Sequence, residues 1–372
     1  MKPLVSILIA AYNAENTIAQ TLESAIAQTW QRKEIILVDD GSTDRTAEVA
    51  RQFKDVILLS TKNQGQSAAQ NHAFSLSQGD YIQYLDADDI LLRDKIEMQL
   101  AALRESDSRR ILLSSPWAPF YYRTRPARFV RNSLCQDLSP VEWLLRKMRE
   151  GIHMQNATWL VSRELAETAG RWDTRLHFDQ DGEYFCRVLL ASEGTRFVPG
   201  TGIYYRMSGL NRVSFIGNSD KKKDSLLLSM KLHIHYLRLL EDSERVRKAC
   251  LAYIQIWSAN FYTGRPDLMQ EAQQLAASLG GRLSVPKSSW KYSWIEKLFG
   301  WAVARQVCQR WNECKSYIIR SCDKVPFCLE RVHAFGKHRR FQGNSAVPGS
   351  SLNASKTRPQ ATDLEGRAKH AR

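Results

Sequence analysis

Acidic side chains follow two strand-like apolar runs of this sequence. Asp39 and Asp40 end the run "EIILVDD", and Asp86 and Asp88 lie within "DYIQYLDADD". In an extended strand, residues two apart point the same way, so Asp86 and Asp88 share one side. Carboxylates gathered in this way repel each other unless a cation or hydrogen-bond donors neutralise them. The oxygen ligands suit Mg²⁺ or Mn²⁺, which commonly bind through one or two carboxylates together with substrate phosphates.

Strands and helices alternate around these acids. Strands are expected at four segments, with helices between them: 4–11, 34–40, 56–61 and 80–89. We expect Asn16 to cap the first helix, and one of Ser42, Thr43 and Asp44 to cap the second. The alternation predicts an α/β fold with a doubly wound, mostly parallel sheet, whose ligand lies at the carboxyl ends of the strands. Tyr12 and Asn13, after the first strand, would lie at the same edge.

The organisation changes near residue 220. Before it, a helix is expected at 91–110, the arginine- and aromatic-rich segment 118–131 is expected to be a loop, and Asp181 lies at a predicted helix start. Beyond it, the pattern favours helices only. We therefore predict an α/β domain at 1–219 with a basic C-terminal helical extension at 220–340, and a disordered, Ser/Gly/Pro-rich tail at 341–372.

The net charge of +14 is unevenly distributed. Residues 1–220 hold 26 Lys and Arg against 27 Asp and Glu, whereas residues 221–372 hold 27 against 12. This asymmetry points to phosphate, either in nucleic acid or on an anionic membrane. Seven scattered cysteines favour a reduced, cytoplasmic protein. No run reaches the ~20 apolar residues that span a bilayer.

Residues 290–340 allow two interpretations. Apolar residues recur at steps of three or four, and they could form one helical stripe: Ile295, Phe299, Val303, Val307, Trp311, Cys314 and Ile318. The helix would then pack on its own domain. Alternatively, this basic, tryptophan-rich segment would lie on an anionic bilayer as a peripheral anchor at the inner face of the plasma membrane. Nucleic acid is the least favoured partner.

Five segments, in this order and spacing, resemble the motifs of family 2 glycosyltransferases. They are "VSILIAAYNAENTI", "EIILVDDGSTDRT", "NQGQSAAQN", "DYIQYLDADD" and "FDQDGEYFCRV", within residues 3–215. The resemblance implies the GT-A fold, a Rossmann-like, mostly parallel sheet flanked by helices. It also implies inverting transfer from a nucleotide-sugar donor, with UDP-sugars expected, and Mg or Mn as cofactor.

The resemblance assigns roles to particular residues. Asp181 matches the catalytic base, Asp88 matches the metal ligand, and Asp86 matches a residue near the ribose or the same metal. Tyr12 and Asp40 match positions that contact the base. Nucleotide binding is also expected at Ala10, Asn13, Asp39, Asn63, Gly65 and Asn71. The last three follow the third strand, where Gly65 would let the main chain approach a ligand or would simply form a turn. Arg206 and Arg212 are assigned to the diphosphate, since guanidinium groups suit phosphate oxygens. The family usually has Glu-Asp where this chain has Gln180-Asp181.

The chemistry is consistent with these residues. Inverting transfer needs one base on the acceptor hydroxyl and a way to hold the departing diphosphate, with no covalent nucleophile. Structural interpretations remain open: the acids could cap helices, Asp181 included, Tyr12 could be a core aromatic, and Arg206 could lie in a surface loop. His72, His153 and His177 lack ligand spacing and are interpreted as structural.

The sequence also leads to a prediction of the acceptor and allows other functions to be compared. The acceptor is expected to be a saccharide or a lipid-linked saccharide, in the synthesis of surface polysaccharide or glycolipid. One alternative is a catalytically silent nucleotide-binding module, which Gln180 supports. A nucleotidyltransferase would want a glycine-rich, basic loop after the first strand, and "AAYNAENT" provides neither feature. A dehydrogenase is excluded because no GxGxxG follows that strand.

Overall fold

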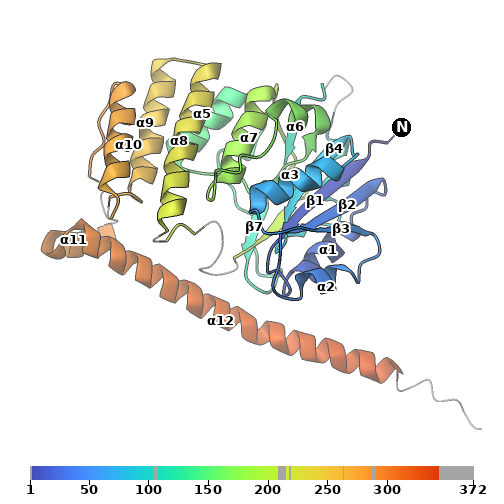
Figure 1. Cartoon of the computed structure of the whole chain (residues 1–372). Coiled ribbons are helices and arrows are strands. Elements are labelled where there is room, and N and C mark those ends of the chain that lie inside the picture. The colour runs from blue at the N-terminus through green and yellow to red at the C-terminus, as the bar shows by residue number, and fades with distance from the viewer. Residues whose placement is uncertain are drawn as a thin grey trace, which may run out of the picture. The chain divides into compact units, whose positions relative to one another are not determined.

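The computed structural model (Figure 1) describes residues 2–103, 108–207, 215–217, 219–262, 264–285 and 290–342. Its contacts divide the chain into two compact units, Met1–Lys324 and Val325–Arg372. The first unit contains the sheets and most of the helices. In the second unit, the described residues up to 342 are helical.

The main sheet has five strands in the order β3-β2-β1-β4-β8. Their bounds are Val56–Ser60 (β3), Lys33–Asp39 (β2), Val5–Ala11 (β1), Tyr81–Asp86 (β4) and Val161–Ser162 (β8). All neighbours pair in parallel except β8, which is antiparallel to β4. The predicted mostly parallel sheet is confirmed, and the apolar runs of β1 and β2 form strands that are covered on both faces.

The register of β1 brings the strand ends together. Ala10 lies opposite Asp86 of β4, and Ala11 lies opposite Asp39 of β2. The strand order reverses at β1, because β2 and β3 lie on one side of it and β4 on the other. Ligands of open α/β sheets bind at such a switch point, outside the carboxyl ends of the strands.

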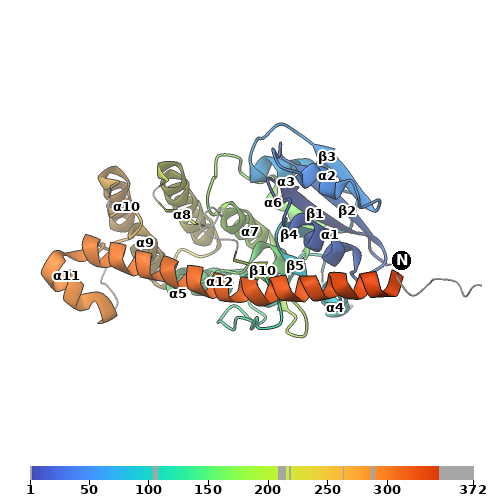
Figure 2. The ribbon, with the colours of Figure 1, turned by 90° about the horizontal axis from the view of Figure 1, so that it is seen from below.

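Helices cover both faces of this sheet. They are α1 (Ile18–Ile26), α2 (Thr46–Ala50) and α3 (Gln66–Leu76). Ile7 and Ile9 of β1 belong to the same apolar cluster as α1, whereas Leu8 belongs to the cluster of α3. Figures 1 and 2 accordingly show α1 and α3 on opposite sides of the strands. This is the doubly wound arrangement.

The caps of α1 and α2 differ from the expectation. Thr17, not Asn16, is the N-cap of α1, and no side chain caps that helix. The N-cap of α2 is Arg45, without a side-chain cap hydrogen bond, so none of Ser42, Thr43 and Asp44 is the cap. The Asp44 Oδ1 atom nevertheless accepts from the N–H of Thr46 at 2.9 Å. Ser42 instead accepts, through Oγ, from the N–H of Asn13 at 2.9 Å. Ser42 thus connects the β1 and β2 loops, a long-range contact that helix-cap reasoning does not consider.

Two smaller sheets extend this unit. Their strands are β5 (Ile90–Leu91), β7 (Trp117–Phe120) and β10 (Ile203–Arg206) in one sheet, and β6 (Ile111–Ser114) and β9 (Gly194–Phe197) in the other. The expected loop at 118–131 is therefore wrong for residues 118–120, which pair in parallel with β10. The expected helix at 91–110 is the shorter α4 (Lys95–Ala101). Leu91 pairs with Ile203 instead, and this distant partner decides its conformation.

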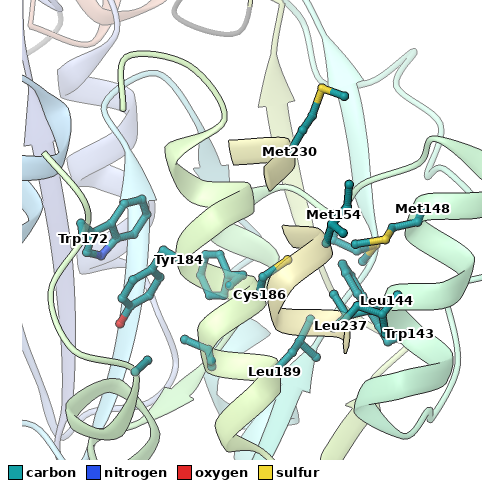
Figure 3. Close-up of a cluster of buried hydrophobic side chains, with 14 of the residues drawn as sticks. Trp143, Leu144, Met148, Met154, Trp172, Tyr184, Cys186, Leu189, Met230 and Leu237 are labelled. Atoms are coloured by element: carbon teal, nitrogen blue, oxygen red, sulfur yellow. The ribbon is translucent and has the colours of Figure 1, made fainter. Parts of the chain in front are cut away.

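Further helices pack against the sheet or, as α9 and α10 do, against other helices. Their bounds are Pro140–Glu150 (α5), Asn156–Thr158 (the short η1), Arg163–Ala169 (α6), Gln180–Ala191 (α7), Asp220–Leu240 (α8), Glu244–Ser258 (α9) and Pro266–Ser278 (α10). Figure 3 shows Trp143 of α5, Tyr184 of α7 and Met230 of α8 in one buried cluster, which also includes Leu8 of β1. The helices beyond residue 219 thus share a hydrophobic core with the sheet. Our division of the chain at that residue stays a prediction.

The last described elements are η2 (Trp290–Tyr292), α11 (Ser293–Phe299) and α12 (Trp301–Gln342). Among the residues the structure describes, no helix is both long and apolar enough to cross a membrane. Our prediction of a disordered tail at 341–372 falls, apart from residues 341 and 342, outside the described residues.

Candidate active site

Asp40 closes the loop between β3 and α3. Its two carboxylate oxygens accept from the N–H groups of Gln64 and Gly65, each at 2.8 Å, and the residue is buried. This contact excludes the interpretation of Asp40 as a cap of α2. Each carboxylate oxygen offers a further acceptor site beside the bond it already makes. Asp40 can therefore support the loop and still accept from a ligand.

Gly41 must be glycine for two reasons. Its φ of 72° lies in the left-handed region. A Cβ at this position would also lie 2.7 Å from the main-chain nitrogen of Asn63. The β2 and β3 loops therefore approach each other closely beside Asp39 and Asp40. The glycine in "DDGST" is explained by this close approach.

Tyr12 and Asn13 extend from the end of β1. Tyr12 is 53% exposed, so its interpretation as a core aromatic is wrong and its ring is accessible to a ligand. Asn13 has a φ of 49°, a region that asparagine tolerates better than most residues. Its Oδ1 accepts from the N–H of Thr43 at 2.8 Å. Asn13 thus connects the ends of β1 and β2.

Asp86 lies among other acids. Its Oδ1 accepts from Gln66 Nε2 at 3.0 Å and from Asn156 Nδ2 at 3.2 Å. Burial raises the pKa of Asp86 to about 7, and the negative charges of Asp88 and Asp181 add to the rise. The structure therefore brings together three predicted site acids from β4, the turn after it and α7. The expectation that one extended strand places Asp86 and Asp88 on the same side is wrong, because β4 ends at Asp86 and Asp88 lies in the following turn. Asp181 is 95 residues away from Asp86 in the sequence.

Arg206 holds the turn that carries Asp88. Its Nε donates to the Asp88 carbonyl at 2.7 Å, and its N–H donates to Asp89 Oδ1 at 2.8 Å. Its Nη2 donates to Gln20 Oε1 at 2.7 Å, and its guanidinium lies over the Phe120 ring. Arg206 is buried, so its interpretation as part of a surface loop is wrong. Its assignment to the diphosphate stays a prediction.

Arg212 and Asn71 are the two other residues predicted to contact the nucleotide sugar. Arg212 lies outside the described residues. Asn71 forms two hydrogen bonds with the main chain of Trp172, through Nδ2 to the carbonyl at 3.0 Å and through Oδ1 from the N–H at 2.8 Å. It therefore anchors the segment before α7. Its assignment to the nucleotide stays a prediction.

Asp181 lies in the first turn of α7, and helix α8 holds the residues before it. Asp179, not Asp181, is the N-cap of α7, so the interpretation of Asp181 as an N-cap is wrong. Ser229 Oγ of α8 donates to Asp179 Oδ2 at 2.9 Å. Ser225 Oγ, also from α8, accepts from the N–H groups of His177 and Phe178 at 2.9 and 3.0 Å.

The backbone at Asp179 is unusual. Its φ of 58° places a residue with a Cβ in the left-handed region, which costs about 1 kcal/mol. The hydrogen bond from Ser229 supports this conformation. The start of α7 is therefore defined by contacts with α8 rather than by local preference.

Gln180 takes part in a side-chain network. Its Nε2 donates to Gln66 Oε1 at 2.9 Å, while Gln66 Nε2 donates to Asp86. Gln66 therefore links α7 to β4. The glutamine that replaces the usual glutamate is buried and hydrogen-bonded. Sequence reasoning missed Gln66 and Asn156, because neither residue type nor spacing indicates a partner so far along the chain.

His153, which we expect to be a structural histidine, lies near Asp181. Its ring stacks on Trp117 with centroids 5.8 Å apart. Burial lowers the pKa of His153, the negative charge of Asp181 opposes this effect, and the positive charge of Lys147 adds to it. His153 is therefore a neighbour of Asp181. Only the packing of the segment after α5 against β7 could have revealed this.

Asp86 and Asp88 are the predicted ligands of Mg²⁺ or Mn²⁺. Within the described residues, no group of three or more His, Cys, Asp or Glu side chains is arranged to hold a metal. Mg²⁺ and Mn²⁺ sites of one or two carboxylates completed by substrate phosphates need fewer protein ligands. Asp86 and Asp88 fit that description, because the mutual repulsion that raises the pKa of Asp86 would be relieved by a cation.

Known proteins resemble this chain in sequence and in fold. Residues 6–128 match the family model "Glycosyl transferase family 2". The chain contains a family 2 glycosyltransferase domain. Among solved structures, TarS 1–349 of S. aureus in complex with UDP-GlcNAc aligns with a TM-score of 0.59 and 14% identity, over 74% of this chain and 81% of TarS 1–349. The complex of the same protein with UDP aligns with a TM-score of 0.54 and 15% identity, over 71% and 73%. The fold is of the GT-A type.

Curated relatives match parts of the chain. The E. coli protein WfaP, a UDP-Glc:alpha-D-GlcNAc-diphosphoundecaprenol beta-1,3-glucosyltransferase, is 44% identical over 26% of this chain and 40% of its own. TuaG of Bacillus subtilis, a putative teichuronic acid biosynthesis glycosyltransferase, is 37% identical over 28% and 43%. An uncharacterised glycosyltransferase of Rickettsia bellii is 35% identical over 76% and 40%. Each alignment spans less than half of the relative's length.

Proposed function

We propose that the protein transfers a sugar from a UDP-sugar to an acceptor hydroxyl with inversion, in the synthesis of surface polysaccharide or glycolipid. The observation that carries the proposal is the gathering of Asp86, Asp88 and Asp181 at the edge where the strand order reverses. WfaP, by its name, uses UDP-Glc and a lipid-linked acceptor, and TarS was crystallised with UDP and UDP-GlcNAc. These names support both the donor and a lipid-linked or saccharide acceptor.

The donor would bind at the ends of β1 and β2. Tyr12 offers an exposed ring to the base, and Asp40 offers acceptor sites beside its bonds to Gln64 and Gly65. Uracil has an N–H group that can donate a hydrogen bond to such a carboxylate. Asp39 is buried next to Asp40, and its Oδ1 accepts from the N–H of Ser42 at 3.3 Å. The proposed binding site of the sugar donor therefore has several hydrogen-bond acceptors whose positions the protein fixes.

Asp88, together with Asp86, would hold Mg²⁺ or Mn²⁺. Once bound, the ion would neutralise the charge that develops on the departing diphosphate. The chain's own contribution is to keep the two carboxylates in position. Gln66 and Asn156 orient Asp86, and Arg206 holds the main chain at Asp88.

Asp181 would act as the general base. Its carboxylate takes the proton of the acceptor hydroxyl while the acceptor oxygen attacks the anomeric carbon. The nucleotide departs from the opposite face, so a single displacement inverts that carbon. His153, stacked on Trp117 beside Asp181, would contribute a ring surface on the acceptor side.

The location we propose is the cytoplasm. All seven cysteines are free, and a reducing compartment keeps thiols in that state.

The donor can be tested by thermal shift. We expect UDP and UDP-sugars, with Mn²⁺ or Mg²⁺, to raise the melting temperature, because a ligand that binds the folded state stabilises it. GDP species should raise it less. If no nucleotide shifts the melting temperature with either ion, the proposed function is wrong.

A second experiment separates the transferase from a silent nucleotide-binding module, the alternative that Gln180 supports. Release of UDP from the stabilising donor is measured for the native chain, Asp181→Asn and the exposed control Asp55→Asn. Loss of release in Asp181→Asn alone supports the transferase. Donor binding without release in the native chain would assign the silent module.

A further inference from the structure

An apolar stripe runs along one face of α12 and is exposed to solvent. It consists of Val303, Val307, Trp311, Cys314 and Ile318, spaced by four, four, three and four residues. At about 100° per residue these positions fall within an arc of about 80°. The exposed fractions are 41% for Val303, 40% for Val307, 63% for Trp311 and 55% for Ile318. Cys314 is exposed as well. We call this set the α12 stripe.

The opposite face of the same helix is held by the protein. Arg305 Nη2 donates to Asn260 Oδ1 at 3.0 Å. Asp323 accepts from the N–H groups of Tyr122 and Arg123 at 2.8 and 3.1 Å, and it forms an ion pair with the Arg123 side chain at 2.8 Å. Arg305 and Asp323 are five turns apart and lie roughly 160° from the middle of the α12 stripe. These contacts therefore direct the stripe away from the core.

Basic residues border the stripe. Measured around the helix axis, Arg310 is about 20° from one edge of the stripe and Lys315 is about 40° from the other. Between Trp301 and Lys324 the helix has five Lys and Arg and two acids, and one of those acids, Asp323, is paired with Arg123. Aromatic residues that favour a bilayer interface are exposed here too: Tyr317 at 72%, and Trp294 of α11 at 59%.

We propose that the α12 stripe and its basic border bind the surface of an anionic lipid bilayer, with α12 lying in the interfacial plane. An exposed apolar face bordered by Lys and Arg is complementary to acyl chains below and anionic headgroups above. A second copy of the chain fits less well, because stripe-to-stripe packing would bring the two sets of Arg310 and Lys315 together. The inference stands independently of the donor and acceptor. It would bring the active site near a lipid-linked substrate.

The test is cosedimentation of the full chain with vesicles. We expect binding to vesicles of equal parts phosphatidylglycerol and phosphatidylcholine, weaker binding to phosphatidylcholine alone, and less binding at high salt because salt screens exposed charges. The test variant is Trp311→Glu with Ile318→Glu. The control, Gln309→Glu with Asn312→Glu, adds the same charge at exposed positions outside the stripe.

The test variant should bind anionic vesicles at least about tenfold more weakly than the control, because two large apolar side chains no longer enter the bilayer. Equal binding by the two variants, or no binding by the native chain, would overturn the proposal. Self-association of the native chain that the test variant loses would assign the stripe to a second copy and would overturn it as well. Thermal melts with the donor show whether the variants remain folded and whether the donor site is intact, so failure here is distinguishable from failure of the proposed function.

Discussion

The candidate site has two parts that are held in different ways. We name them after their proposed roles: the donor side is Asp39, Asp40 and Asp86, and the base side is Asp181 with the preceding residues 177–179. On the donor side, Asp40 accepts from main-chain N–H groups, and strand register aligns Ala10 with Asp86. On the base side, side chains of α8, about fifty residues further along the chain, hold the residues that precede Asp181. The donor side belongs to the segment that matches the family model, and α8 lies outside it. The base side should therefore be more sensitive to remote substitutions.

Asp181→Asn should have the largest effect of the substitutions considered. Removing a general base lowers kcat by about 10²–10⁴-fold, whereas the thermal shift caused by the donor should persist because Asp181 is assigned to the acceptor. Rates of UDP release and sugar transfer give the measurement, with Asp55→Asn as the control. Retention of most of the activity would remove Asp181 from the mechanism.

Asp40→Asn tests the donor side. An asparagine side chain has one acceptor oxygen, so either Gln64 or Gly65 would lose the partner of its N–H. A buried donor without a partner costs about 1–3 kcal/mol of the free energy of unfolding. Urea denaturation measures the loss, and the donor should also bind more weakly. Asp39→Asn is the comparison: the hydrogen bond that the Asp39 Oδ1 accepts from the N–H of Ser42 is longer, at 3.3 Å, so this variant should lose less. Equal losses would contradict the bonding described for Asp40.

The pH dependence of the stability of Asp179→Asn tests the base side. Burial raises the pKa of Asp179 from 3.8 to about 6, with Lys147 opposing the rise and Asp181 adding to it. The folded chain therefore holds this proton more tightly than the unfolded chain. The resulting stability is full below about pH 4 and is lost as pH rises through about 6.

Asparagine keeps the left-handed backbone and has no charge to bury. Relative to that of the native chain, the free energy of unfolding of Asp179→Asn should rise by on the order of 1–2 kcal/mol between about pH 4 and pH 8. Denaturant titrations at the two pH values measure this gain. A constant difference between variant and native chain would show that Asp179 does not titrate in this range.

Ser229→Ala should have the smallest effect. It removes the hydrogen bond to Asp179, worth about 1 kcal/mol, and we expect kcat to fall several-fold while KM for the donor changes little. Ser229→Thr, which keeps the hydroxyl, should recover much of the rate, and Ser278→Ala on the exposed face of α10 serves as the control. An equal change in KM and kcat would contradict a positioning role on the base side alone.

Much of the donor side could be predicted from sequence. The apolar runs of β1, β2 and β4 are buried on both faces, so they stand out as strands, and the acids that end them lie at one edge of a parallel sheet. The strand β7 was missed, because its partner β10 lies about eighty-five residues away. The local capping rule is wrong at both helices, where Thr17 and Arg45 are the N-caps. Such a rule cannot anticipate that Ser42 bonds to Asn13.

The base side shows where sequence reasoning ends. The sequence predicts the type and place of Asp181, but the spacing of His153 and Gln66 gives no sign that they lie near the acids. Both lie near the acids only because α3, α5 and α7 pack on neighbouring parts of the sheet and its helices. Side-chain spacing along the chain has no information about such contacts.

The sequence by itself determined where the main strands lie along the chain, the acids that end them and the family of the domain, because burial patterns and motifs are properties of adjacent residues. The tertiary structure alone decided that Asp88 and Asp181 lie close enough to Asp86 to act on its charge, that Gln66 and Gln180 connect β4 to α7, and that Ser229 of α8 holds Asp179 at the start of α7. Hydrogen bonds and charge interactions act through space, so they depend on how distant segments pack.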